Sequence, residues 1–219
     1  MRLRNIPGAQ DAILESPYVV QEPQTKKGHW TEVFEKKQPL HIEVGMGKGR
    51  FLMDLARLHP EINYVGIEMY DSVLLRALQK REELEEKGEV YSNLFFMRVD
   101  ARLLPEIFEK GEADKIYLNF SDPWPKSKHF KRRLTYKDFL DIYRDILTPD
   151  GDIHFKTDNA GLFSFSLCSF EENGFYLSEQ CDDLHHSRFA EDNVMTEYEA
   201  NFLAQGLPIH RVVASKQKK

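Results

Sequence analysis

The stretch L-H-I-E-V-G-M-G-K-G, residues 40–49, decides the fold of this 219-residue chain. Its first five residues form a short, mostly apolar run typical of a strand, and glycines follow at positions 45, 47 and 49. Glycine lets the backbone turn tightly and come close to a bound ligand. The stretch therefore predicts a strand that ends in a ligand-binding loop, as in the first unit of an open α/β sheet.

Strand and helix patterns alternate after this point. Apolar runs predict strands over 40–44, 63–68, 93–99, 115–120, 152–157, 175–181 and 208–214. Helical periodicity fills the intervals between them, most clearly over residues 70–87. Such alternation predicts an α/β fold with a mostly parallel, seven-stranded sheet and helices on both faces.

Local signals place some boundaries inside this pattern. Thr135 with Asp138 resembles a capping box that begins a helix, and T-P-D-G at 148–151 is typical of a turn. Residues 1–38 contain prolines and the basic pair Lys26-Lys27 instead of a regular pattern. They predict an irregular, partly mobile, basic N-terminal extension, followed by one domain over 39–219.

Composition excludes several classes of protein. Hydrophobic residues make up 41% and charged residues 30%, and no run approaches the roughly 18 apolar residues that a membrane span needs. The N-terminus lacks the apolar core of a secretory signal. Cys168 and Cys181 have no metal-ligand spacing. We therefore expect a cytoplasmic protein with no membrane partner and no metal site.

Charge is distributed unevenly along the chain. The net charge is −6, which disfavours a general nucleic-acid binder, but residues 126–133, K-S-K-H-F-K-R-R, contain five cations and no acid. An acidic body with one basic segment can dock RNA locally. The alternative is that 126–133 forms a solvated basic loop.

Carboxylates end or follow each of the first five predicted strands: Glu43, Glu68, Asp100, Asp122 and Asp158. Ligands of open parallel sheets bind beyond the carboxyl ends of the strands, so these side chains are candidates for one site. Each also has a simpler interpretation. Asp100 and Asp158 could cap the helices that follow, and Glu43 could meet a surface cation.

Three kinds of glycine loop compete for residues 43–49. A phosphate-binding P-loop is excluded because G-x-x-x-x-G-K-[ST] is absent. A dinucleotide loop needs G-x-G-x-x-G, but here the third glycine comes one place early and position 50 is Arg. The remaining match is an S-adenosylmethionine loop, in which an acid such as Glu43 precedes G-x-G-x-G. Glu68 would hold a ribose diol, a role that NAD would also require.

The segment N-F-S-D-P-W-P-K, residues 119–126, follows the fourth predicted strand. Pro123 and Pro125 restrict its backbone, so the loop can aim Asp122 at a substrate. Trp124 could stack on a base or simply pack inside a rigid loop. Since the basic segment begins at once, the loop indicates a substrate that combines a base with a phosphate chain.

Four segments together give a resemblance: residues 43–49 and 119–133, H-F-K-T-D-N at 154–159, and M-T-E-Y-E at 195–199. In this order they resemble the bacterial tRNA (guanine-N7)-methyltransferase family, from about residue 39 onward. The resemblance implies a class I, Rossmann-like methyltransferase fold with an antiparallel last strand. It also implies methyl transfer from S-adenosyl-L-methionine to N7 of a variable-loop guanine in tRNA.

The resemblance further implies roles for individual residues. Cofactor contacts are expected from Glu43, Gly45, Gly47, Glu68, Asp100 and Asp122. Substrate contacts are expected from Lys126, Asp158, Thr196, Glu197, Tyr198 and Glu199. RNA contacts are expected from Lys128, Lys131, Arg132 and Arg133.

Chemistry assigns Asp122 the catalytic role. Guanine N7 carries no proton at neutral pH, so no strong base is needed, and a fixed carboxylate can stabilise the positive charge that develops on the purine. Arg2, Arg4, Lys26 and Lys27 would extend the RNA surface. T-x-x-E at 196–199 is also a capping-box pattern.

Rival functions remain open at this point. They are an N-methyltransferase acting on another RNA, a protein amide or a small molecule, a non-catalytic RNA-binding module, and, less favoured, an NAD-dependent oxidoreductase. The protein is expected to be a monomer or a homodimer.

Overall fold

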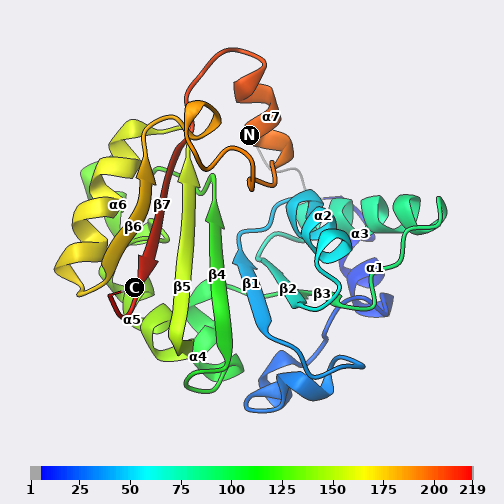
Figure 1. The fold of residues 1–219 in the computed structure, drawn as a ribbon. Coiled ribbons are helices and arrows are strands. Elements are labelled where there is room, and N and C mark those ends of the chain that lie inside the picture. The colour runs from blue at the N-terminus through cyan, green and yellow to red at the C-terminus, as the bar shows by residue number, and fades with distance from the viewer. Residues whose placement is uncertain (1–5, 219) are drawn as a thin grey trace.

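A computed structural model of the chain describes residues 6–218. Its centre is a seven-stranded sheet in the order β3-β2-β1-β4-β5-β7-β6 (Figure 1). Neighbouring strands from β3 to β5 are parallel, and β7 runs antiparallel to both β5 and β6. The predicted fold class is therefore confirmed. The strands are β1 (Leu40–Val44), β2 (Asn63–Glu68), β3 (Leu94–Arg98), β4 (Ala113–Asn119), β5 (Leu147–Thr157), β6 (Tyr176–Cys181) and β7 (His210–Ser215).

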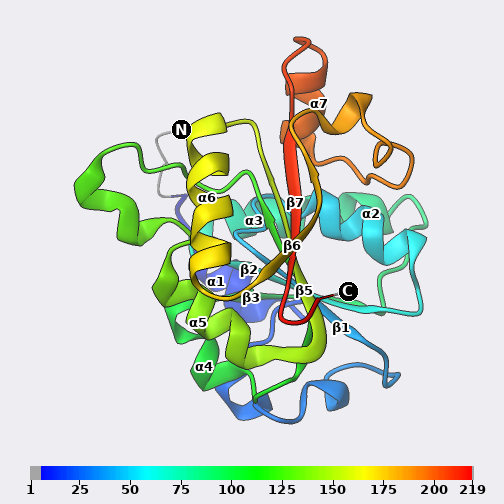
Figure 2. The ribbon, with the colours of Figure 1, turned by 60° about the vertical axis from the view of Figure 1, so that its left-hand side comes forward.

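Helices cover both faces of this sheet, and each face has its own apolar core. The helices are α1 (Ala9–Glu15), α2 (Arg50–Leu58), α3 (Asp71–Glu85), α4 (Leu104–Ile107), α5 (Lys137–Ile146), α6 (Ala160–Glu172) and α7 (Glu197–Leu203). Side chains of α4, α5 and α6 pack in one core, and those of α1, α2 and α3 pack in the other. Figure 2 shows α5 and α6 on one side of the sheet and α2 on the other. None of the helices in the described part of the chain is long and apolar enough to cross a bilayer.

Close packing between β2 and the loop after β1 fixes the position of that loop. A side chain at Gly66 in β2 would collide with Met46 of the loop and with Phe96 of β3. The loop backbone turns through left-handed conformations at Gly45, φ 78°, and Gly47, φ 59°. Only glycine adopts these angles without strain, which explains the spacing seen in the sequence.

The N-terminal segment is not irregular over its described residues. Helix α1 and two 3-10 turns, Pro23–Lys26 and Trp30–Glu32, form there. Trp30 is buried, and its indole N–H donates to the Ile107 carbonyl over 3.0 Å. The prediction of an irregular segment was wrong, because the prolines and charged residues of the sequence give no sign of the few deeply buried side chains that hold it in place.

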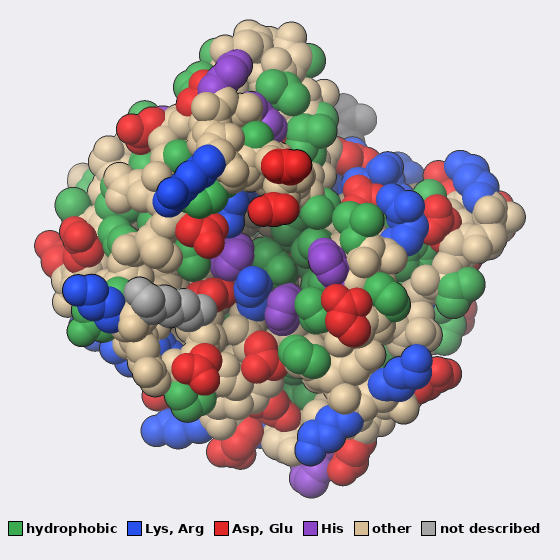
Figure 3. All heavy atoms as spheres, in the orientation of Figure 1, with side chains coloured by type: hydrophobic (Ala, Val, Ile, Leu, Met, Phe, Trp, Pro, Cys, Tyr) green, Lys and Arg blue, Asp and Glu red, His purple; other side chains and the backbone are tan. Residues whose placement is uncertain are grey.

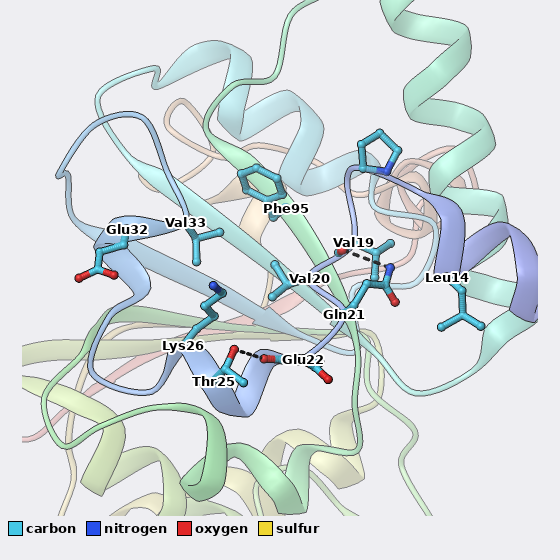
Figure 4. A pocket seen from close by; sticks show the side chains of 11 residues that line it. Leu14, Val19, Val20, Gln21, Glu22, Thr25, Lys26, Glu32, Val33 and Phe95 are labelled. Carbon is cyan, nitrogen blue, oxygen red and sulfur yellow. Dashed lines mark hydrogen bonds between the residues drawn. The ribbon is translucent and has the colours of Figure 1, made fainter.

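Part of this segment protects the edge of the sheet. The Val20 N–H donates to the Phe96 carbonyl and the Phe96 N–H donates to the Tyr18 carbonyl, each over 2.9 Å. Edge strand β3 is thus covered on its open side. A groove of about 790 Å³ remains between this segment and β3, with Val19, Val33 and Phe95 among its lining residues (Figure 4).

Two local predictions were wrong. Residues 148–151 do not form a turn between elements but lie inside β5. Ala113 of β4 pairs with Leu147 of β5, but Lys115, only two residues later in β4, pairs with Asp152, five residues later in β5. The extra residues form a bulge. Thr135 does not cap α5, because it is buried against α6 and its hydroxyl bonds with the Ser166 hydroxyl over 2.8 Å.

Candidate active site

The predicted carboxylates lie at one edge of the sheet. Strands β1 to β5 are parallel, so their carboxyl ends all point toward α7 (Figure 1). Seen as spheres, the face of the sheet that fronts the view of Figure 1 is hollowed below α7, with hydrophobic, histidine and basic side chains inside the hollow (Figure 3). The five residues at this rim are Glu43, Glu68, Asp100, Asp122 and Asp158.

Glu43 is buried at the centre of the rim, with 2% of its surface exposed. Its Oε1 accepts a hydrogen bond from the Asn119 amide over 2.8 Å, whereas Oε2 has no hydrogen-bond partner among residues 6–218. Burial raises the pKa of Glu43 to about 8, opposed in part by Asn119 and by the charge of Lys156. A buried carboxylate oxygen without a partner indicates a ligand that supplies a donor there. A surface cation is excluded as the partner of Glu43 by this burial.

Glu68 ties the rim to the glycine loop. Its carboxylate accepts hydrogen bonds from the backbone N–H groups of Gly47, Met69 and Tyr70, over 3.2, 2.9 and 3.1 Å. Burial raises the pKa of Glu68, and the nearby Asp122 carboxylate raises it further. The charge of Glu68 in turn helps to raise the pKa of Glu43. Three of the predicted carboxylates therefore share one electrostatic neighbourhood.

The space beside this neighbourhood is open at the glycine loop. A Cβ atom added at Gly47 would meet no atom within 4 Å. Gly47 thus presents its backbone to a free volume next to Glu68, as a ligand-cradling loop requires. Gly45 lies two residues away and would place a Cβ 3.8 Å from Leu134.

Asp100 and Asp158 differ from the central carboxylates. Asp100 caps the 3-10 turn Ala101–Leu103 and bonds to the Arg102 side chain, which lowers the pKa of Asp100. Its capping role is confirmed. Asp158 is half-buried and does not cap α6, because Asn159 accepts the hydrogen bond from the Leu162 N–H over 2.8 Å.

The loop after β4 is strained and internally braced. Phe120 and Trp124 adopt positive φ angles of 52° and 40°, which are costly for non-glycine residues. The Arg133 guanidinium donates to the carbonyls of Pro123 and Trp124 over 2.8 and 3.3 Å. Arg133 is 6% exposed, so it braces this loop from inside and is not presented to an RNA phosphate. The loop leaves Asp122 exposed at the rim.

The other cations of the basic segment lie on the surface. Lys126, Lys128, Lys131 and Arg132 are exposed, the last three within the 3-10 helix Ser127–Arg132. The Arg132 guanidinium lies 4.9 Å from the ring centre of the half-buried Trp124. This arrangement leaves four exposed cations in the segment that follows Asp122 in the chain.

The predicted N-terminal cations do not extend this surface where the structure describes them. The Lys27 ammonium donates to the Pro105 carbonyl over 2.7 Å, at the start of α4. The adjacent Gly28 N–H donates to Glu112, directly before β4. Lys26 and Lys27 therefore lie at the amino end of β4, the opposite end from Asp122. Arg2 and Arg4 lie outside the described residues.

Helix α7 begins over the rim with the predicted capping box. The Thr196 hydroxyl accepts from the Glu199 N–H over 2.9 Å, and the Glu199 carboxylate accepts from the Thr196 N–H over 3.3 Å. Glu197 forms ion pairs with Lys80 and, over 4.0 Å, with Lys48 of the glycine loop. Glu199 is fully buried, so the structure gives it an internal role.

Several residues of this site escaped the sequence analysis. Asn119 orients Glu43, and Phe120 lies with its ring centre 5.4 Å from that of Tyr198. Lys156 in β5 forms a 2.7 Å ion pair with Glu199. A lysine inside the apolar run D-I-H-F-K-T was the available signal, because a buried lysine needs a partner.

Comparisons with known proteins agree with this geometry. A family model described as "Putative methyltransferase" matches residues 37–212. A tRNA (guanine-N(7)-)-methyltransferase from Lachnoclostridium phytofermentans is 54% identical, with 100% of both chains covered. An enzyme of the same name from Geobacillus kaustophilus is 52% identical, with 98% of this chain and 96% of the relative covered.

Solved structures support the fold alone. The 16S rRNA methyltransferase KamB superimposes with a TM-score of 0.59 at 11% identity, covering 89% of this chain and 90% of that one. An antibiotic-related methyltransferase superimposes with a TM-score of 0.56 at 20% identity, covering 88% and 89%.

The fold is that of a class I methyltransferase, and the chain is a methyltransferase that uses S-adenosyl-L-methionine. Within that class, the chain belongs to the tRNA (guanine-N7)-methyltransferase family. This membership removes the oxidoreductase and the non-catalytic module from consideration.

Proposed function

We propose that this protein transfers the methyl group of S-adenosyl-L-methionine to N7 of a guanine in the variable loop of tRNA. One observation carries the proposal: the buried Oε2 of Glu43, which has no partner within residues 6–218, lies in the same electrostatic neighbourhood as Glu68 and Asp122, beside an exposed cationic segment. A cationic nucleoside and a phosphate chain are the two ligands that such a surface favours. Since its substrate would be tRNA, we place the protein in the cytoplasm. We also propose that it is a monomer or a homodimer.

The residues of the rim fit the cofactor. Glu68, fixed by three backbone N–H groups, would accept hydrogen bonds from the ribose hydroxyls. Glu43 would meet a donor or a positive charge with its Oε2. The backbone at Gly45 and Gly47 would allow close approach, and Asp100 would contact the ligand from the turn that follows β3. When bound, S-adenosylmethionine supplies an electrophilic methyl group on a positively charged sulfur.

Asp122 would contribute to methyl transfer through its contacts with the base more than to the binding of the cofactor. Guanine N7 is an unprotonated acceptor, so the protein has no proton to remove from it. The Asp122 carboxylate would accept hydrogen bonds from guanine N1–H and the exocyclic amine, and would stabilise positive charge developing on the ring. Holding N7 in line with the methyl group lowers the barrier further, by about 7 kcal/mol or more for well-oriented reactants.

Two neighbouring aromatic rings offer the base a stacking partner. Tyr198 is 54% exposed, and its ring centre lies 5.4 Å from that of Phe120, two residues before Asp122. Unstacked bases of RNA bind by stacking on such rings. We therefore assign Phe120 and Tyr198 to the guanine, in addition to the substrate contacts expected from Asp158, Thr196 and Glu197.

The phosphate chain would follow the exposed cations Lys126, Lys128, Lys131 and Arg132. These side chains begin four residues after Asp122, so the base and its backbone would be held by one continuous segment. Arg133 is left out of this set because of its internal bonds.

A chemical assay tests the proposed function. The protein is incubated with labelled S-adenosylmethionine and unmodified tRNA, and the RNA is then treated with borohydride and aniline, which cleaves at 7-methylguanosine. We expect label in the RNA and cleavage at one guanosine of the variable loop. Label without cleavage would indicate another position on RNA, and label only in protein would indicate an amide acceptor; either result contradicts the proposal.

A further inference from the structure

Lys156 is an unusual residue for its position. It lies one place before the end of β5 and is 5% exposed. Its ammonium donates to the Asn193 side-chain oxygen over 3.0 Å, to the Val194 carbonyl over 3.0 Å, and to Glu199 over 2.7 Å. All three partners belong to residues 193–199, the segment that begins α7. One side chain of the sheet therefore satisfies several acceptors of that segment.

Glu199 receives the matching set of contacts. Its Oε2 accepts from Lys156 and from the Thr196 N–H, and its Oε1 accepts from the Asn193 amide over 2.6 Å. The carboxylate is fully buried, and burial lowers the pKa of Lys156 while the Glu199 charge opposes that shift. Two charges taken out of water in this way cost much of what their attraction returns, so the pair is poor support for stability alone.

The pair matters for position because the start of α7 is held mainly by polar contacts: beside Lys156–Glu199, Glu197 pairs with Lys80 and Lys48, and His185 lies 3.4 Å from Glu199. Glu199 is the buried residue of this seven-residue helix, and the side chains of Tyr198 and Leu203 are exposed. Apolar packing comes mainly from Val194, which is half-buried against the core beside α2. A helix without an apolar face toward the protein depends on its polar contacts for its place.

The fastened segment carries the substrate side of the pocket. Tyr198 meets Phe120 there, and Glu197 reaches Lys48 of the glycine loop. Burial raises the pKa of the Glu43 carboxyl and the Lys156 ammonium charge partly opposes that rise, so Lys156 acts electrostatically on the cofactor carboxylate while it contacts residues 193–199.

We propose that Lys156 is a positioning residue for methyl transfer: through its buried ion pair with Glu199 it holds residues 193–199 over the pocket and so sets the place of Tyr198. The inference rests on the proposed function for its effect on tRNA, but the anchoring of the segment itself does not. It assigns a role to a lysine whose ammonium donates to three acceptors of the protein itself.

The test compares Lys156→Met, Glu199→Gln and the double variant with the wild type. For Lys156→Met we expect the tRNA KM to rise by about tenfold or more, while the Kd for S-adenosylmethionine changes by less than about threefold. The double variant should recover part of this loss, because it leaves no unpaired buried charge. Lys115→Met is the matched control: Lys115 lies on β4, is partly exposed, and pairs with Asp152 over 3.8 Å.

Limited trypsin digestion reports on the segment without using activity. Arg188 is exposed in the stretch before Asn193, and we expect faster cleavage there in Lys156→Met than in the wild type or in Lys115→Met. Unchanged cleavage and unchanged KM overturn the proposal, as does an equal loss of cofactor and tRNA binding. Faster cleavage in a protein whose wild type fails to methylate tRNA would keep the anchor and reject the proposed function.

Discussion

The central carboxylates and the basic segment stand at the same edge of the sheet, yet folding has prepared them differently. Glu43 and Glu68 are buried, and one oxygen of Glu43 lacks a partner within the described chain. Lys128 and Lys131 are exposed to solvent. A buried carboxylate oxygen without a hydrogen-bond partner selects a ligand that places a donor at that point. Exposed cations attract any phosphate chain, and this attraction weakens as the salt concentration rises. Specific chemistry is therefore expected from the carboxylates, and general attraction from the cations.

Asp122 lies where these two regions meet, and its removal should have the largest effect. We expect Asp122→Asn to lower the single-turnover rate by about 100-fold to 1000-fold, as for loss of one preorganised electrostatic group. Cofactor affinity should change much less, since Asp122 is exposed and Glu43 and Glu68 remain. Rapid-quench measurement of methylated tRNA gives the rate. Asp150→Asn, at an exposed site in the β5 bulge, is the control; a near-normal rate for Asp122→Asn would remove it from the mechanism.

Glu68→Ala should affect the cofactor instead. Glu68 is held by three backbone N–H groups and is proposed to bind the ribose. Its loss should raise the Kd for S-adenosylmethionine about 10-fold to 100-fold, equivalent to roughly 1.5–3 kcal/mol for hydrogen bonds to a charged group. Calorimetry at fixed pH measures this directly. The ribose assignment fails if the affinity matches that of the wild type.

The sequence located these carboxylates because parallel strands bring their ends together. Observed β1 and β2 have the predicted bounds of 40–44 and 63–68, and each acid ends or follows its strand. Neither the spacing nor the residue types depend on distant contacts, so periodicity and glycine chemistry were sufficient for this part of the site.

The partners of buried charged residues could not be predicted in the same way. Arg133 looks like its neighbours in K-S-K-H-F-K-R-R, but its guanidinium lies 4.0 Å from the ring centre of Phe130 and 4.4 Å from that of Phe165. Glu199 likewise depends on Lys156, more than forty positions earlier in the chain. Partners so far apart in sequence are set by tertiary packing, which no local pattern contains.

Proton release on cofactor binding offers a sharper test of the buried carboxylate Glu43. With a pKa of about 8, Glu43 is mainly protonated in the free protein at pH 6–7, and a bound cationic ligand favours its carboxylate. Cofactor binding should therefore release up to one proton, and the Kd should fall as pH rises from 6 to 8, by at most about tenfold per unit.

Calorimetry in buffers of different ionisation enthalpy measures this release. Glu43→Gln is the matched control, because it keeps an oxygen for Asn119 and cannot ionise, and any proton lost by the ligand itself cancels in the difference. Equal proton release by the two proteins would show that Glu43 does not change its charge on binding.

Changes in the exposed basic segment, residues 126–133, should have the smallest effect on activity and the clearest effect on the salt dependence of tRNA binding. Replacing Lys128 and Lys131 by Gln should reduce the slope of log affinity for tRNA against log salt by about 0.7–0.9 for each phosphate that the protein no longer neutralises. Filter binding at several salt concentrations measures the slope. Lys26→Gln with Lys27→Gln is the matched control, since these lysines lie at the amino end of β4. If both double variants flatten the slope equally, the tRNA must contact both ends of the sheet, and the basic segment is not the main phosphate-binding surface. If the slope is unchanged in Lys128→Gln with Lys131→Gln, residues 126–133 form only a solvated loop.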